Sequence, residues 1–204
     1  GEASKLSIDI GAQDQRALAY MAIAQIYTYR SDWDEALEAY NISVNIFDKL
    51  KDLRSCANAY RGLGVVSRRR GEYNKAVEHY KKSIELSEKT GDMRLASSAY
   101  VDIGLVYKVT GELDLAVKHI QKSVEILEKE KELYELARAY NNLGTIYYEQ
   151  KELDSALQWF EKCVEISRKI GFIRAEAYGL SNAGELYARP VSYTHLRAHE
   201  TGRN

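Results

Sequence analysis

The chain has 204 residues, of which 45% are hydrophobic and 29% are charged, a balance typical of a globular domain. It contains no apolar run long enough to cross a bilayer, so we predict no membrane span. The 29 basic and 30 acidic residues give a net charge of -1, which excludes bulk electrostatic attraction to nucleic acid or anionic lipid. We therefore expect neither nucleic acid nor a membrane as a partner.

Two cysteines, Cys56 and Cys163, lie far apart and lack any paired metal-ligand spacing. This pattern argues against a disulfide framework and against a zinc site. It favours a reducing compartment, and we predict a cytoplasmic protein.

The first segment, residues 1–10, matches the second half of a pattern that recurs through the chain. Ala3 falls where Ser43 falls 40 residues later, and Leu6 falls where Ile46 falls. We interpret residues 1–16 as the end of a truncated preceding repeat and its turn.

Four complete repeats follow at a spacing of 40 residues, with the boundaries 17–56, 57–96, 97–136 and 137–176. Residues 177–189 form the first helix of a truncated fifth repeat. Three positions recur in phase: Tyr20, Tyr60, Tyr100 and Tyr140; Gly64, Gly104, Gly144 and Gly184; Ala36, Ala76, Ala116 and Ala156. A fixed period of this size predicts an all-α solenoid, because one helix pair cannot bury its apolar face alone.

Within each repeat a break is expected about every 20 residues. The predicted breaks are Gly11, Ser31, Lys51, Gly71, Gly91, Gly111, Lys131, Lys151 and Gly171. Glycine readily takes the left-handed conformation that closes a helix. The next residue is usually acidic, which suits a helix start. Each helix is then about 17 residues, or about 25 Å, long.

The recurring small residues have a predicted packing role. Glycines such as Gly64 and Gly144 remove bulk where the two helices of a repeat cross, and Ala76 does the same from the facing helix. Aromatic side chains fill the adjoining space in three repeats, and an isoleucine replaces the ring in the remaining one: Tyr40, Tyr80, Phe160 and Ile120.

These residues resemble the tetratricopeptide repeat family. Its aromatic, Leu-Gly and Tyr pattern is found in YNNLGTIY (140–147) and YVDIGLVY (100–107). The resemblance implies a right-handed α-solenoid of antiparallel helix pairs. The 40-residue spacing differs from the usual 34 and is similar to the long-helix variety of kinesin light chains, spindle-orientation adaptors and prokaryotic regulators. The family's proline near the end of the second helix is also missing.

The pattern stops after Arg189. Residues 190–204 can be back-translated to a string that resembles a sequencing-library adapter, so we interpret them as a non-native tail. His195 and His199 are accordingly not considered metal ligands.

The resemblance implies a concave groove lined by the first helix of each repeat, which is the expected peptide-binding surface. The candidate groove residues are Asn58, Arg61, Arg68, Val101, Leu105, Lys108, Arg138, Asn141, Asn142, Thr145, Tyr148, Tyr178, Ser181, Asn182 and Glu185. Arg61, Arg68 and Lys108 suggest a partner with an acidic segment, held by charge-assisted hydrogen bonds that salt would screen. The alternative is that these cations are simply solvated.

Two devices of the family can be compared with this chain. The clamp for a C-terminal carboxylate is absent, because its Lys and Asn positions hold other residues, such as Met21 and Gln25. An asparagine ladder, whose amides pair with a peptide backbone, is represented only in its later half by Asn142 and Asn182.

No catalytic constellation or phosphate-cradling loop is visible, so we predict no enzyme, no cofactor and no metal. His79 and His119 share a repeat position, but no third ligand repeats there. The leading hypothesis is a non-catalytic scaffold that binds a peptide or helix of another protein. The alternatives are a sensor segment of a larger signalling protein, such as a histidine kinase or transcription regulator, and self-association through uncapped ends.

Overall fold

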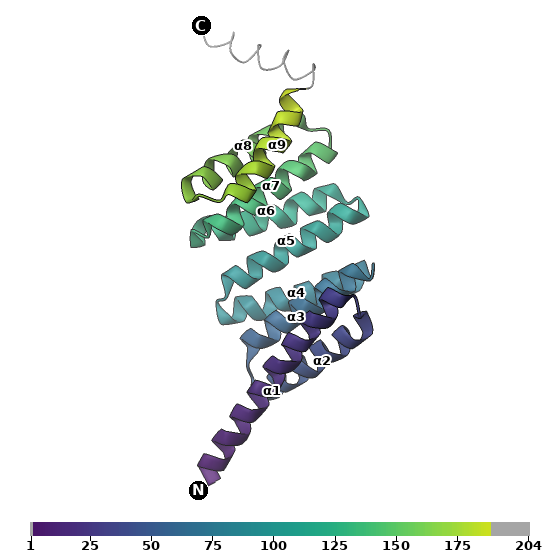
Figure 1. The fold of residues 1–204 in the computed structure, drawn as a ribbon, viewed down its shortest axis with the longest axis vertical. Coiled ribbons are helices and arrows are strands. Elements are labelled where there is room, and N and C mark those ends of the chain that lie inside the picture. The colour runs from purple at the N-terminus through teal and green to yellow at the C-terminus, as the bar shows by residue number, and fades with distance from the viewer. Residues whose placement is uncertain (1, 189–204) are drawn as a thin grey trace. The chain divides into compact units, whose positions relative to one another are not determined.

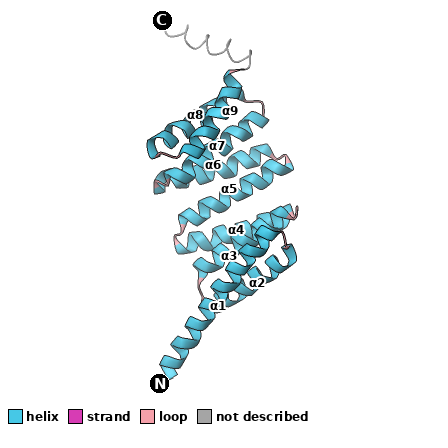
Figure 2. Cartoon of the chain, in the orientation of Figure 1, coloured by secondary structure: helices cyan, strands magenta, loops and turns pink. Residues whose placement is uncertain are grey.

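The structure is a computed structural model that describes the backbone of residues 2–188 and the side chains of residues 11–188. The described residues are all helix and short turns, with no strand (Figures 1 and 2). The all-α prediction is thereby confirmed. The proposed adapter-encoded tail, residues 190–204, lies outside the described residues.

Nine helices cover the described part of the chain. Their bounds are α1 Glu2–Arg30, α2 Trp33–Leu50, α3 Leu53–Arg69, α4 Tyr73–Thr90, α5 Met93–Thr110, α6 Leu113–Glu130, α7 Leu133–Glu149, α8 Leu153–Ile170 and α9 Ile173–Tyr187. From α2 onward, each helix begins at the apolar residue that follows a predicted break.

The turns between helices use one backbone geometry. The residue at every predicted break from position 31 onward has a positive φ: Ser31, Lys51, Gly71, Gly91, Gly111, Lys131, Lys151 and Gly171. After α2, the Lys51 amide donates to the Asp48 carbonyl and the Asp52 amide donates to the Phe47 carbonyl. This pair of bonds is the Schellman motif, which satisfies carbonyls at a helix end. Lysine adopts the left-handed conformation here because these bonds hold it in place.

The acidic residues after the turns act in two ways. Asp52 and Asp92 accept hydrogen bonds from the Ser55 and Leu95 amides, at 3.0 and 3.1 Å. Longer side chains such as Glu132 make no such bond. There the favourable interaction is with the positive end of the helix dipole.

The predicted break at Gly11 is wrong, because α1 runs without interruption from Glu2 to Arg30. Gly11 lacks the positive φ of the other break glycines. A glycine inside a helix costs about 1 kcal/mol relative to alanine, so it permits a turn without imposing one. The assignment of residues 1–16 to a preceding repeat stays a prediction.

The chain divides into two compact units, residues 1–110 and 111–204. In the first unit, helices consecutive in sequence pack together, and α1 contacts α3 as α3 contacts α5. In the second unit, α6 to α9 pack in the same consecutive way and α7 contacts α9. Within each unit the first helices of successive repeats therefore lie side by side.

The small residues pack as the sequence predicts. A Cβ placed on Gly64 would lie 2.5 Å from the Tyr80 ring, and one on Gly144 would lie 2.5 Å from the Phe160 ring. The alanines at the facing position are fully buried in all four repeats: Ala36, Ala76, Ala116 and Ala156. The aromatic rings thus occupy space that only glycine leaves open.

This packing predicts that Gly144→Ala destabilises the chain by about 1–3 kcal/mol, because the added methyl would overlap the buried Phe160 ring. The matched control is Gly184→Ala, where a Cβ meets nothing within 4 Å. Its higher helix propensity should leave stability unchanged or raise it by up to about 1 kcal/mol. Urea denaturation measures both free energies of unfolding, and equal values for the two variants would contradict this account.

Candidate functional site

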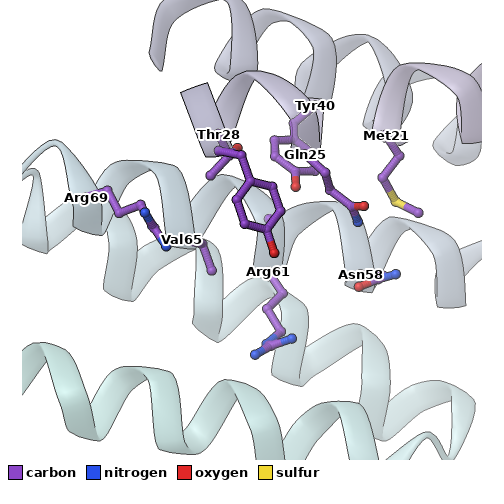
Figure 3. A pocket seen from close by; sticks show the side chains of 10 residues that line it. Met21, Gln25, Thr28, Tyr40, Asn58, Arg61, Val65 and Arg69 are labelled. Carbon is purple, nitrogen blue, oxygen red and sulfur yellow. The ribbon is translucent and has the colours of Figure 1, made fainter. Parts of the chain in front are cut away.

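A pocket of about 390 Å³ lies between α1 and α3 in the first unit (Figure 3). Its lining residues are Met21, Gln25, Thr28 and Tyr29 of α1, Tyr40 of α2, and Asn58, Arg61, Gly62, Val65 and Arg69 of α3. The lining includes two arginines and no carboxylate. It combines an apolar surface with several hydrogen-bonding groups, as ligand pockets commonly do.

Helical spacing brings these side chains to one face. Met21, Gln25 and Thr28 stand at i, i+4 and i+7 on α1, and residues three or four apart share a helix surface. Arg61, Val65 and Arg69 follow the same rule on α3. Because α1 and α3 are neighbouring first helices, the two faces form opposite walls of the pocket.

The wall contributed by Tyr40 depends on Gly62. A Cβ on Gly62 would lie 2.3 Å from the Tyr40 ring, so glycine lets the ring lie directly against α3. Tyr40 is buried. Burial raises the pKa of its phenol, while the Thr28 hydroxyl and the Arg61 charge oppose that shift. The phenol is therefore neutral at physiological pH.

Arg61 is held by a partner on the next first helix. Its Nε lies 2.7 Å from Oδ2 of Asp102 on α5, whose side chain is only 11% exposed. Arg61 thus belongs to the pocket, but Asp102 already neutralises its charge.

The other two predicted cations lie differently. Arg68 is half-buried and does not line the pocket, and its charge acts on the buried Tyr80 phenol. Lys108 is half-buried near the end of α5 and has a partner of its own. Arg69, which sequence reasoning did not select, is exposed and lines the pocket. Val101 and Leu105 are half-buried on α5.

The second unit contains a pair at the same repeat positions. Asn182 Nδ2 donates to Asn141 Oδ1 at 3.0 Å. Both this pair and Arg61–Asp102 join residues 41 apart, from the fifth position of one first helix to the sixth of the next. The amides of the expected asparagine ladder therefore bond in part to protein side chains.

No such polar side-chain pair joins α1 to α3. The corresponding residues are Met21 and Gly62, which cannot form a polar pair, and both line the pocket. The pocket thus lies where the polar side-chain pair is missing. The sequence signal that would have found these pairs is a comparison of the fifth position of each first helix with the sixth position of the next, 41 residues later. The same comparison shows that Met21 and Gly62 cannot form such a pair.

The remaining predicted groove residues lie on α7 and α9. Tyr148 donates to Glu185 Oε1 at 2.7 Å, and Thr145 donates to the Asn142 carbonyl at 2.8 Å. Three others are exposed: Arg138, Tyr178 and Ser181. The structure brings Tyr148 and Glu185 together.

Among the described residues, no group of three or more His, Cys, Asp or Glu side chains is placed to hold a metal ion. His79 is half-buried, and its ring centroid lies 6.3 Å from that of Tyr60. Desolvation lowers the pKa of His79. The described helices also include none with the length and apolarity to span a bilayer.

A family model described as tetratricopeptide repeat matches residues 15–89 and 95–169. The chain belongs to the tetratricopeptide repeat family. This confirms the resemblance carried by YNNLGTIY and its counterparts. A comparison with curated protein sequences finds no significant match.

Solved tetratricopeptide repeat structures are similar in fold. The apo form of RapI is 21% identical, with a TM-score of 0.77 over 91% of this chain and 67% of that one. Aspartyl phosphate phosphatase F from Bacillus subtilis is 17% identical, with a TM-score of 0.80 over 93% of this chain and 49% of that one.

A third similar structure is a Signal Transduction ATPase with Numerous Domains protein with a tetratricopeptide repeat sensor, from Pyrococcus horikoshii. It is 16% identical, with a TM-score of 0.77 over 94% of this chain and 30% of that one. The chain therefore spans about half of the phosphatase and less than a third of the ATPase. At these identities the likeness shows the fold alone.

The Arg61–Asp102 ion pair predicts an energetic coupling between α3 and α5. A double-mutant cycle of Arg61→Gln and Asp102→Asn measures this coupling. The double variant should lose less free energy of unfolding than the two single variants lose in sum. The coupling is expected at about 0.5–3 kcal/mol, as for residues in direct contact. Urea denaturation of the four proteins measures it, and additive effects would show that the pair contributes nothing.

Both cysteines should be inert in the folded chain. Burial, with the Asp48 and Asp52 charges, raises the pKa of Cys56 to about 11, and burial also raises the pKa of Cys163. Since the thiolate is the reactive form, iodoacetamide at pH 8 should alkylate both much more slowly than in guanidinium, where the thiol pKa returns to about 8.5. Fast alkylation of either cysteine in the native protein would contradict the burial described.

Proposed function

We propose that the chain is a non-catalytic scaffold that binds a peptide of a partner protein across its first helices. The pocket between α1 and α3 carries the proposal. Its walls offer the apolar side chains Met21 and Val65 beside hydrogen-bonding groups such as Gln25 and Asn58. A volume of about 390 Å³ suits one large side chain of an extended peptide.

Charge favours an acidic group next to that side chain. The residues that line the pocket include no carboxylate. Arg69 is exposed at the pocket, whereas Arg61 is already paired with Asp102. An incoming carboxylate would pair with Arg69 at little desolvation cost and would stay sensitive to salt. The partner is therefore a segment that places Asp or Glu beside an aromatic or aliphatic residue.

The location proposed for this activity is a reducing compartment such as the cytoplasm. The supporting observation is that Cys56 and Cys163 are both free and buried.

A second candidate function is that of a sensor segment in a larger signalling protein. It is favoured by similar structures whose names include an aspartyl phosphate phosphatase and a signal transduction ATPase with a tetratricopeptide repeat sensor. In that case ligand binding in the same pocket would control an activity located on other sequence. The complete reading frame distinguishes the two candidates, because an adjoining catalytic or DNA-binding domain favours the sensor.

Arg69→Gln tests the acidic-peptide proposal. The probe is an array of 12-residue peptides in which one aromatic or aliphatic residue is flanked by Asp or Glu, paired with the same peptides carrying Lys. We expect binding to the acidic set only, about a tenfold loss of affinity in Arg69→Gln, and weaker binding at higher salt.

The matched control is Arg94→Gln, since Arg94 is also exposed in the first unit but does not line the pocket. Equal loss in both variants would indicate a general charge effect and would remove Arg69 from the site. Equal binding of the acidic and lysine peptides would refute the acidic specificity.

A further inference from the structure

The lining of the α1–α3 pocket includes one aromatic side chain that the protein leaves almost uncovered. Tyr29 lies in the last turn of α1 and lines the pocket. It is 88% exposed. Tyrosine combines a large apolar ring with little conformational freedom, and it is enriched among the residues that dominate binding energy. Tyr29 is therefore placed to contact whatever enters the pocket.

The exposure of Tyr29 belongs to its repeat position. The same position, at successive steps of 40 residues, holds Arg69 on α3, Val109 on α5 and Glu149 on α7. All three are exposed as well, Val109 at 60%. Helices α3 and α5 each follow another repeat in the chain, and that repeat does not bury the position. We therefore expect a repeat packed before α1 to leave Tyr29 exposed at the pocket.

Tyr29 and Arg69 form two walls at one end of the pocket. They occupy the same repeat position on α1 and α3, which contact each other, and both line the pocket. Met21 and Asn58 lie at the other end of the pocket from Arg69 (Figure 3). An aromatic ring and a guanidinium group are thus offered together where the two helices end.

A flat aromatic side chain gains more from these two neighbours than an aliphatic one. Its ring can pack on the Tyr29 ring, in the offset or edge-to-face arrangements that aromatic pairs prefer. The Arg69 guanidinium can lie over its other face as a cation–π contact. An aliphatic side chain of similar volume gains only the burial of apolar surface, which Tyr40 and Val65 of the same pocket also provide.

Stacking on a ring leaves Arg69 able to bind an anion. The hydrogen-bond donors of a guanidinium group lie in its plane, so the face can cover a ring while the edge pairs with a carboxylate. An aromatic residue and a neighbouring Asp or Glu can therefore use the same arginine.

We propose that Tyr29 is a specificity-determining residue, which makes the pocket select an acidic peptide with an aromatic side chain over the same peptide with an aliphatic one. This selectivity rests on the function proposed for the pocket. It narrows the residue beside Asp or Glu to phenylalanine, tyrosine or tryptophan. In the complex the aromatic ring lies between Tyr29 and Arg69.

The test uses two 12-residue peptides that differ at one residue, a phenylalanine or a leucine, flanked on both sides by aspartate. Their affinities for the full chain are measured by fluorescence anisotropy. We expect the phenylalanine peptide to bind about three- to tenfold more tightly, which is the range for one or two aromatic contacts. Tyr29→Leu keeps an apolar side chain at the position and should reduce this preference to less than about twofold.

Two control variants separate the ring of Tyr29 from other effects. Tyr29→Phe keeps the ring and should keep the preference. Val109→Leu changes the same repeat position on α5, which does not line the pocket, and should leave both affinities unchanged. Because Tyr29 and Val109 are exposed, all three variants should unfold at the wild-type temperature, which circular dichroism verifies.

The outcomes distinguish this selectivity from the function on which it rests. Equal affinity of the two peptides for the wild-type chain would overturn the selectivity alone, because acidic peptides would still bind. A preference that Tyr29→Leu leaves intact, or that Val109→Leu also removes, would do the same. Failure of both peptides to bind would overturn the proposed function of the pocket and the selectivity with it.

Discussion

The structure depends on one steric constraint, the contact of an aromatic ring with a glycine on the facing helix. Tyr80 lies against Gly64 and Phe160 against Gly144, each so close that a single methyl group would overlap the ring. The contact fixes how near the two helices of a repeat approach each other. The contact occurs in two repeats, 80 residues apart, so the same close approach of two helices is found in both units.

Regular stacking has a direct consequence for the surface made by the first helices. Within each unit it places the fifth position of one repeat beside the sixth position of the next. Where both are polar, as in Arg61–Asp102 and Asn141–Asn182, the side chains bond to each other. Where they are Met21 and Gly62, a pocket lies instead. Recognition is thus expected where the protein leaves its own side chains unpaired.

The proposed binding pocket combines apolar packing with electrostatic attraction. The pocket is a mixed polar and apolar hollow whose exposed cation is Arg69, so it suits a short acidic segment and should respond to salt.

The sequence by itself determined the helices, their turns and the packing of small residues on rings. A 40-residue period repeats the same local information four times, and a turn residue such as Lys51 or Gly91 has the same effect in each copy. Gly11 is the exception, because a helix end needs bonds from the following residues as well as a permissive glycine. The sequence also placed Asn58 and Arg61 on the helix face that lines the pocket.

Only the tertiary structure decided which of those groove side chains are available. The prediction treated Arg61, Arg68 and Lys108 as equivalent cations, but Asp102 binds the first, and the other two lie outside the pocket, which Arg69 lines instead. Charge on a helix face can be read from a single segment. Its pairing depends on residues about 40 positions away, whose distance is set by how the helices pack.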